Sequence, residues 1–213
     1  MAANTTSGNN QSYDGGHGNR IFLGLDPDIA LVQEMNVGNN TSSTYRTWVN
    51  ENFGTSFHYF VESGAQIPNG IVSRYPILSS GRWTDPQVSN RGFVWARIDI
   101  PGDTHLFAVS VHLLTSGSSA RNSEALALVN LIKTQSQVPN GDFLVIGGDL
   151  NTDNRNEACL ATFSQLVRTS GPYPADHNGN GNTNASRSKP YDWVLPGNSL
   201  ATYSTPLVVG GST

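Results

Sequence analysis

The stretch "VIGGDLNT" (145–152) places two polar side chains directly after a strand that has the composition of a buried one. Asp149 and Asn151 supply a carboxylate and an amide at the point where this strand should reach solvent. The two glycines before them would allow a substrate to approach the backbone closely. A rigid strand behind such groups is suited to holding a water molecule and a phosphate in fixed positions.

Other polar residues lie at the ends of predicted strands. Asn4 follows a short N-terminal segment, Glu34 ends "DIALVQE", His112 interrupts "FAVSVHLL", and Asp192 opens "YDWVL". In α/β proteins, functional groups gather where several strands end, so we expect these side chains to meet Asp149. Carboxylate and amide ligands without a thiol favour a hard cation, Mg²⁺ or alternatively Mn²⁺, that meets a phosphate.

The elements that must position these residues alternate between strands and helices. Apolar runs rich in Val, Ile and Phe predict strands, and segments with helical spacing predict helices. "FVWARIDIPGDTHLFAVSV" contains a Pro-Gly-Asp turn and predicts an antiparallel hairpin, so the sheet should be mixed. The predicted strands are 28–35, 70–78, 91–100, 105–114, 142–150 and 191–196, and the predicted helices are 41–54, 118–135 and 156–168.

Length and composition restrict the class of protein. The 213 residues are enough for one domain with a sizeable core, and the formal net charge of −4 argues against a broad basic surface that grips nucleic acid. The single cysteine, Cys159, has the spacing of a buried helical residue. We find no apolar run of about 18 residues and no amphipathic segment, which disfavours membrane insertion and a lipid surface. The composition favours an exported protein, and we expect a monomer.

Several blocks, in this order along the chain, carry a resemblance to a known family. They are "ANTTSGNNQSYD", "PDIALVQE", "NGIVSRYPI", "SVHLL", "GGDLNT" and "RSKPYDWVL". Together they resemble the endonuclease/exonuclease/phosphatase superfamily, whose members include DNase I and exonuclease III. The resemblance covers nearly the whole chain and implies a DNase I-like α/β fold. That fold is a four-layer sandwich of two mixed β-sheets flanked by helices.

The resemblance also implies roles for the metal side of the site. Glu34 is similar to the main Mg²⁺ ligand, and Asn4 to the neighbour that holds the metal or the scissile phosphate. Asp149 resembles the carboxylate that orients or deprotonates the attacking water.

Further roles concern the phosphate and the leaving group. Asn151 resembles the amide that places the phosphate, and His112 the histidine that donates a hydrogen bond or a proton beside it. Asp192 resembles the carboxylate that holds a second, C-terminal histidine. We add Arg74 and Arg187 as candidates for substrate contacts.

The family's last block, Ser-Asp-His or a variant, is missing from the sequence. No histidine follows His177, and the Asp176-His177 pair runs into "NGNGNTN", which cannot form the strand that the family pattern requires. We therefore expect residues 1–213 to be one domain truncated at its C-terminus, and the short segment before Asn4 suggests an N-terminal truncation as well. Without its partner histidine, Asp192 would support weak catalysis at best.

The segment 176–187 has some features of a calcium loop. Asp176, Asn178 and Asn180 occupy the first, third and fifth positions, with Gly181 at the sixth. The twelfth position is Arg187 in place of the bidentate Glu, so we do not expect Ca²⁺ to bind there. A surface loop beside the substrate groove is the favoured interpretation.

The leading hypothesis is a magnesium-dependent phosphodiester hydrolase, a DNA endonuclease or exonuclease that uses water attack at phosphorus. His112 in "SVHLL" favours the DNase I-like branch. A phosphatase or sphingomyelinase-type phosphoesterase would use the same metal centre with other surrounding loops. A third hypothesis is a catalytically impaired fragment that binds metal or nucleic acid without turnover.

Overall fold

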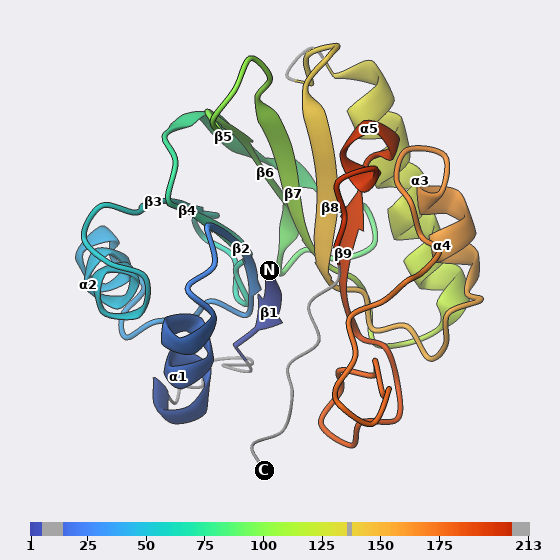
Figure 1. Cartoon of the computed structure of the whole chain (residues 1–213), viewed down its shortest axis with the longest axis horizontal. Helices are drawn as coiled ribbons and strands as arrows, with labels where there is room; N and C mark the ends of the chain where they lie inside the picture. The colour runs from blue at the N-terminus through green and yellow to red at the C-terminus, as the bar shows by residue number, and fades with distance from the viewer. Residues whose placement is uncertain (6–14, 136–137, 206–213) are drawn as a thin grey trace.

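The computed structural model describes residues 1–5, 15–135 and 138–205 (Figure 1). It contains nine strands and five helices within these ranges. The strands are β1 (Ala2–Asn4), β2 (Ile29–Gln33), β3 (His58–Val61), β4 (Gly70–Ser73), β5 (Ile77–Thr84), β6 (Gly92–Ile98), β7 (Leu106–His112), β8 (Phe143–Asp149) and β9 (Asp192–Pro196). The helices are α1 (Gly15–Leu25), α2 (Ser42–Asn52), α3 (Ser118–Thr134), α4 (Ala158–Phe163) and α5 (Asn198–Ala201).

The strands form two mixed sheets that face each other. One sheet has the order β1-β2-β4-β3 and the other β5-β6-β7-β8-β9. β1 pairs in parallel with β2, and β7 in parallel with β8, while β6 and β7 form the predicted antiparallel hairpin. Helices α1 and α2 lie outside the first sheet, and α3 and α4 lie outside the second (Figure 1). The predicted sandwich of two mixed sheets flanked by helices is confirmed.

Three apolar clusters separate the four layers. Trp48 and Val49 of α2 pack with Phe22 of α1 on the first sheet. Leu128 and Phe163 belong to the cluster between α3, α4 and the second sheet. The third cluster lies between the sheets; its buried members are Leu31, Ile71, Val94, Ala96, Ile98, Leu106, Ala108 and Val145. Leu31 of β2 belongs to this third cluster, and the residues on either side of it in β2 face the helices instead, as the two-residue period of a strand requires.

The segment predicted as one strand at 70–78 is divided between the two sheets. β4 ends at Ser73 and β5 begins at Ile77, so the chain passes from the first sheet to the second between them. Pro76 restricts Tyr75 and has no N–H for a ladder, which explains the break. The helix predicted at 156–168 is also shorter, because α4 ends at Phe163.

Helix α1 was not predicted from the sequence. It buries Phe22 against Trp48 and Phe53, while Ile21, Leu23 and Leu25 are exposed. Ile21 and Leu25 are one turn apart on one side of α1, and Leu23 lies on another side, so the helix exposes apolar side chains that were not anticipated from the sequence. Among the described helices, none has the length and hydrophobicity needed to cross a membrane.

Candidate active site

Four predicted site residues meet at one edge of the sandwich because their strands end there. Asn4 is the last residue of β1, and Glu34 follows β2, its parallel neighbour. His112 and Asp149 are the last residues of β7 and β8 and lie opposite each other in the parallel ladder. Strand ends are rigid supports. Strands β2, β7 and β8 have a paired neighbour on each side, whereas β1 is an edge strand paired with β2.

The side-chain amide of Asn4 joins the two sheets. Its Nδ2 donates to Glu34 Oε1 at 3.0 Å and to Asp149 Oδ2 at 2.9 Å. Glu34 belongs to the first sheet and Asp149 to the second, so one amide brings together two carboxylates that are far apart in the sequence. Two acidic groups so close repel each other when both are ionised, and a cation between them would relieve that repulsion.

His112 lies beside both carboxylates. Its Nε2 is 3.8 Å from Glu34 Oε1 and 3.9 Å from Asp149 Oδ2, and Nδ1 has no hydrogen-bond partner in the described part of the chain. Burial, together with the charge of Arg91, lowers the pKa of His112 to about 3. The imidazole is therefore neutral near pH 7, so it can donate a hydrogen bond but does not serve as a charged acid.

Asp149 and Asn151 are fixed by the turn after β8. Burial raises the pKa of Asp149, and hydrogen bonds from the Asn4 side chain and the Asn151 backbone oppose that change. The Asn151 N–H donates to Asp149 Oδ1 at 2.9 Å, and Asn151 Nδ2 donates to the Leu113 carbonyl at 2.9 Å. The φ of Asn151 is +50°, a conformation that Asn tolerates better than most residues. The turn thus aims the Asp149 carboxylate and ties it to the end of β7.

Asp192 adjoins the cluster because it lies opposite Asp149 in the β8–β9 ladder. Burial and the charge of Asp149 raise its pKa to about 7, against hydrogen bonds from Thr183 and the Asn4 backbone. Its Oδ1 is buried without a hydrogen-bond partner among the described residues. The carboxyl group can therefore carry a proton near neutral pH.

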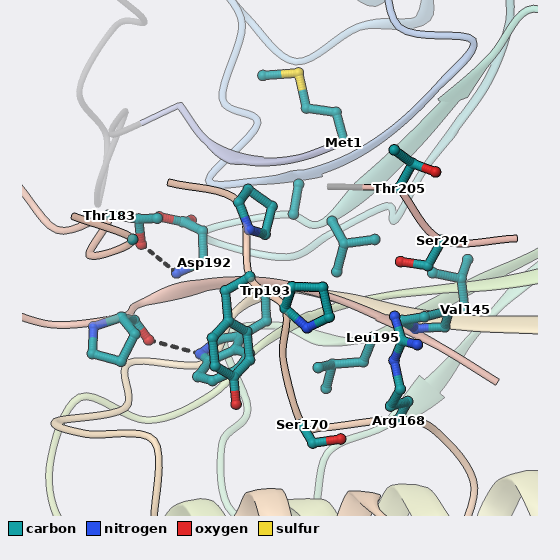
Figure 2. A pocket seen from close by; sticks show the side chains of 18 of the residues that line it. Met1, Val145, Arg168, Ser170, Thr183, Asp192, Trp193, Leu195, Ser204 and Thr205 are labelled. Atoms are coloured by element: carbon teal, nitrogen blue, oxygen red, sulfur yellow. Dashed lines mark hydrogen bonds between the residues drawn. The ribbon is translucent and has the colours of Figure 1, made fainter. Parts of the chain in front are cut away.

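Asp192 also lies on the wall of a pocket of about 610 Å³ between β1 and β9. Figure 2 shows it beside Thr183, whose hydroxyl accepts a hydrogen bond from the Asp192 N–H at 2.7 Å. Much of the remaining wall is apolar and includes Met1, Val145 and Leu195. Of the predicted site residues, Asp192 is the one that lines this mainly apolar cavity.

Arg91 supports the site from behind and was missed in the sequence. Its Nε donates to the His112 carbonyl at 2.6 Å, and one terminal nitrogen donates to the Leu113 carbonyl at 3.1 Å. The residue is buried, and burial lowers its pKa while the charge of Glu124, and to a lesser degree that of Asp85, opposes this. The carbonyls that it binds are about twenty residues away along the chain, so no local sequence pattern predicts this role.

Arg74 is not brought to the cluster. β4 runs antiparallel to β2, and its first residue, Gly70, pairs with Val32 near the site. Arg74 follows the last residue of β4 and therefore lies at the opposite edge of the sheet. There Arg74 pairs with Asp28 at 2.7 Å and Asp26 at 2.8 Å. The prediction that Arg74 binds substrate does not fit this placement.

Arg187 lies in the loop that leads to β9. It pairs with Asp176 at 2.8 Å, and the other oxygen of Asp176 accepts the N–H groups of Asn178 and Asn180. Loop and arginine thus form a self-contained network. Arg187 as a substrate contact and the absence of Ca²⁺ from this loop stay predictions.

The two glycines before Asp149 serve the packing of the sheets. A Cβ on Gly147 would lie 2.7 Å from Leu31 Cδ1 of the opposite sheet. A Cβ on Gly148 would lie 2.8 Å from Gln33 Nε2 and would collide with the Val111 carbonyl oxygen. From the sequence, we expected these glycines to let a substrate approach the backbone closely. In the structure it is side chains of the opposite sheet that approach the backbone at these two positions.

The donor set of the site fits a hard cation. Among the described residues there is no cluster of three or more His, Cys, Asp or Glu side chains that could hold a metal ion. Mg²⁺, however, is usually bound by one or two carboxylates and keeps several waters. Glu34 and Asp149, bridged by the Asn4 amide, supply oxygen donors of that kind.

Comparisons with known proteins agree with this architecture. Residues 19–212 match the Endonuclease/Exonuclease/phosphatase family. A curated relative, Sphingomyelinase C of Bacillus cereus, is 25% identical over 155 residues, and the match covers 64% of this chain and 42% of the relative. The chain therefore spans less than half the length of this relative.

Solved structures show the same fold at low sequence identity. Sphingomyelinase C from Streptomyces griseocarneus has a TM-score of 0.68 and 15% identity, with 92% of this chain and 82% of that one covered. A humanized D. rerio TDP2 has a TM-score of 0.63 and 19% identity, with 96% and 84% covered. The family match extends over almost the whole chain, and the chain belongs to the endonuclease/exonuclease/phosphatase family.

Proposed function

We propose that this protein is a metal-dependent phosphodiester hydrolase. The observation that carries the proposal is the Asn4 amide bound to both Glu34 and Asp149, with the neutral His112 ring beside them. A phosphodiester is an anion attacked by a poor nucleophile. Catalysis therefore needs charge neutralisation, a prepared water and a hydrogen-bond donor to the phosphate, and this cluster offers groups for each.

The metal side of the proposal involves Glu34 and Asn4. Glu34, with the Asn4 amide oxygen, would hold Mg²⁺, with Mn²⁺ as an alternative. When bound, the cation neutralises phosphate charge and polarises the P–O bonds. The family resemblance implies the same assignment.

The remaining steps belong to the chain's own side chains. Asp149 accepts a proton from water as the water oxygen bonds to phosphorus, because burial has raised the basicity of its carboxylate. His112 donates a hydrogen bond to a phosphate oxygen, and Asn151 fixes the turn that aims Asp149. As the P–O bond to the leaving group breaks, Asp192, whose pKa is raised to about 7, gives its proton to the departing oxygen.

DNA is the first substrate class within this proposal. The block that contains His112 is similar to the DNase I-like branch, and a local metal would offset the net charge of −4 where the phosphate binds. We further propose that the protein acts as a monomer and is exported, as its composition favours.

Sphingomyelin-type phospholipids are the second candidate substrate. Helix α1 exposes Ile21 and Leu23, and Leu25 of the same helix lines the apolar pocket beside Asp192. An apolar surface next to a phosphodiester site is what a lipid substrate requires. The curated relative is named Sphingomyelinase C.

One assay set separates these hypotheses. We would measure nicking of supercoiled plasmid and release of phosphocholine from sphingomyelin micelles, with Mg²⁺, with EDTA and with Glu34→Ala. Nicking that needs both Mg²⁺ and Glu34 supports the nuclease, and phosphocholine release with the same requirements supports the phospholipase. Metal binding without turnover of either substrate would identify the catalytically impaired alternative and overturn the proposal of hydrolysis.

A further inference from the structure

The candidate site is assembled from two sheets whose described strands pair within their own sheet. Asn4 and Glu34 come from the first sheet, and His112 and Asp149 from the second. The spacing of the two carboxylates therefore depends on how the sheets are aligned. Apolar contact between them is not directional and cannot fix this alignment by itself.

A polar link crosses the interface directly behind the site. Gln33 is the residue before Glu34; its Nε2 donates to Ser110 Oγ of β7 at 2.8 Å. The same hydroxyl donates to the Val32 carbonyl of β2 at 3.2 Å. Gln33 and Ser110 are both fully buried, so these two bonds join β2 to β7 inside the sandwich. Among the described residues, the other buried polar bonds between the sheets, those of Glu62 and Asn69 with Gly92, involve the ends of β3, β4 and β6 and none of the strands that carry the site.

The backbone next to this link is shaped to admit it. Gly148 comes directly before Asp149, and a Cβ there would lie 2.8 Å from Gln33 Nε2. The Thr5 hydroxyl lies 3.1 Å from the Gln33 carbonyl and 2.6 Å from the Glu34 carbonyl, and thus holds β1 to the same point of β2. Gln33 of β2 is in this way bonded to a side chain of β7 and to Thr5, the residue that follows β1.

Stability alone does not account for a glutamine at this position. Gln33 Oε1 is buried and has no hydrogen-bond partner among the described residues. A buried acceptor without a partner costs free energy, and an apolar side chain of similar length would avoid that cost. A costly polar residue adjacent to a site is a sign of a positional requirement.

We propose that Gln33 is a positioning residue whose bond to Ser110 aligns the two sheets and thereby sets the distance between Glu34 and Asp149. This inference rests on the proposed function, since that distance matters for a metal and a phosphate. Neither residue touches substrate. They act on the site only through Glu34 and through the end of β7.

The test uses the full chain and the variants Gln33→Met, Ser110→Ala and the double variant. Mn²⁺ affinity would be measured from the electron paramagnetic resonance signal of the free ion, and turnover with bis(p-nitrophenyl) phosphate. We expect each single variant to weaken Mn²⁺ binding about tenfold, and the double variant to bind no more weakly than Ser110→Ala, because Ser110→Ala already removes both the Gln33–Ser110 and the Ser110–Val32 bonds. Urea unfolding should show Gln33→Met at least as stable as the parent protein.

Thr162→Val is the matched control. It removes a partly buried side-chain hydrogen bond, from Thr162 Oγ1 to Asn122 Oδ1 at 2.6 Å, which joins α4 to α3 away from the site. We expect this variant to lose stability and to keep its Mn²⁺ affinity and turnover within about twofold.

The outcomes distinguish the two proposals. If the parent protein binds Mn²⁺ but hydrolyses no phosphodiester, the proposed function is wrong, and the role of Gln33 is decided by Mn²⁺ affinity alone. If Gln33→Met binds Mn²⁺ and turns over as the parent does, the positioning role is wrong. Additive losses in the double variant would also contradict it, and a parent protein that binds no Mn²⁺ would overturn both.

Discussion

Two regions of the molecule are rich in Asp, Asn and Gly, and they use these residues in opposite ways. The active-site cluster joins residues from distant parts of the chain, such as Asn4 and Asp149, and buries them. The loop at 176–188 bonds mainly to itself, with Asp176 held by nearby N–H groups and by Arg187. Similar composition thus gives a buried cluster of neighbouring acids in one place and a loop with paired polar groups in the other.

The carboxylates of the two regions differ in the direction of their pKa shifts. Burial raises the pKa of Asp149, whereas backbone N–H groups and Arg187 lower the pKa of Asp176. Asp176 forms an ion pair with an arginine, while Asp149 is bridged to a second carboxylate by the Asn4 amide. A buried carboxylate beside another acid is the better candidate for binding a metal, whatever the local sequence pattern suggests.

The largest expected effect is on turnover in the cluster. Asp149→Asn removes the group that accepts the proton of water while keeping its shape, so kcat for phosphodiester hydrolysis should fall about a thousandfold. Steady-state kinetics at saturating Mg²⁺ would measure this. A fall of less than about tenfold would mean that Asp149 is not the base.

Arg91→Met tests the support behind the cluster. It removes the Arg91 donor from the His112 carbonyl, leaves the Leu113 carbonyl with the Asn151 amide alone, and leaves the buried Glu124 without the neighbouring Arg91 cation. We expect a loss of about 3 to 5 kcal/mol in the free energy of unfolding, measured in urea. Exposed Arg187, changed to Met as the control, should cost far less. Equal losses in the two variants would contradict the assigned importance of Arg91.

Asp192→Asn should change how stability depends on pH. The folded-state pKa of Asp192 is raised to about 7 from an ordinary value of 3.8, so ionisation above pH 7 destabilises the folded protein and below about pH 4 this effect is absent. In EDTA, the variant should exceed the parent protein by on the order of 2 to 4 kcal/mol above pH 8, with the difference vanishing near pH 4. Parallel stability curves across this range would show that Asp192 does not titrate as stated.

Asp176→Asn should have the smallest effect. Its side chain is half-buried and its charge is balanced by Arg187. We expect Mn²⁺ affinity and kcat to stay within about twofold of those of the parent protein. The variant should be slightly less stable than the parent, and this difference should vanish at high salt because salt screens the Asp176–Arg187 pair of the parent protein. A loss of metal binding in this variant would mean that the loop, and not the cluster, holds the metal.

The parts of the site that the sequence predicts are those with a local signature. Asp149 and Asn151 follow an apolar run and two glycines, and Glu34 and His112 end or interrupt apolar runs. Strand ends of an α/β fold converge, so the meeting of these side chains follows from the order of strands along the chain. The mixed sheets and the β6–β7 hairpin were predictable for the same reason.

The parts that could not be predicted depend on contacts between distant segments. Arg91 donates to carbonyls of β7 and the residue after it, and Gln33 bonds to a serine of the opposite sheet. The need for glycine at position 148 also depends on distant segments, because the Val111 carbonyl oxygen of β7 and the Gln33 amide of the opposite sheet occupy the space where a side chain would lie. Arg74 was a candidate for a substrate contact because the sequence alone does not show at which edge of the sheet the strand before it ends.

The most direct test is to locate the metal. Crystals of the full chain soaked in Mn²⁺ would be examined by anomalous scattering, with Glu34→Gln crystals as the control. We predict one peak beside Glu34 and Asn4 that is absent from the variant. A peak beside Asp176, or an unchanged peak in the variant, would contradict the assignment of the metal centre to the junction of the two sheets.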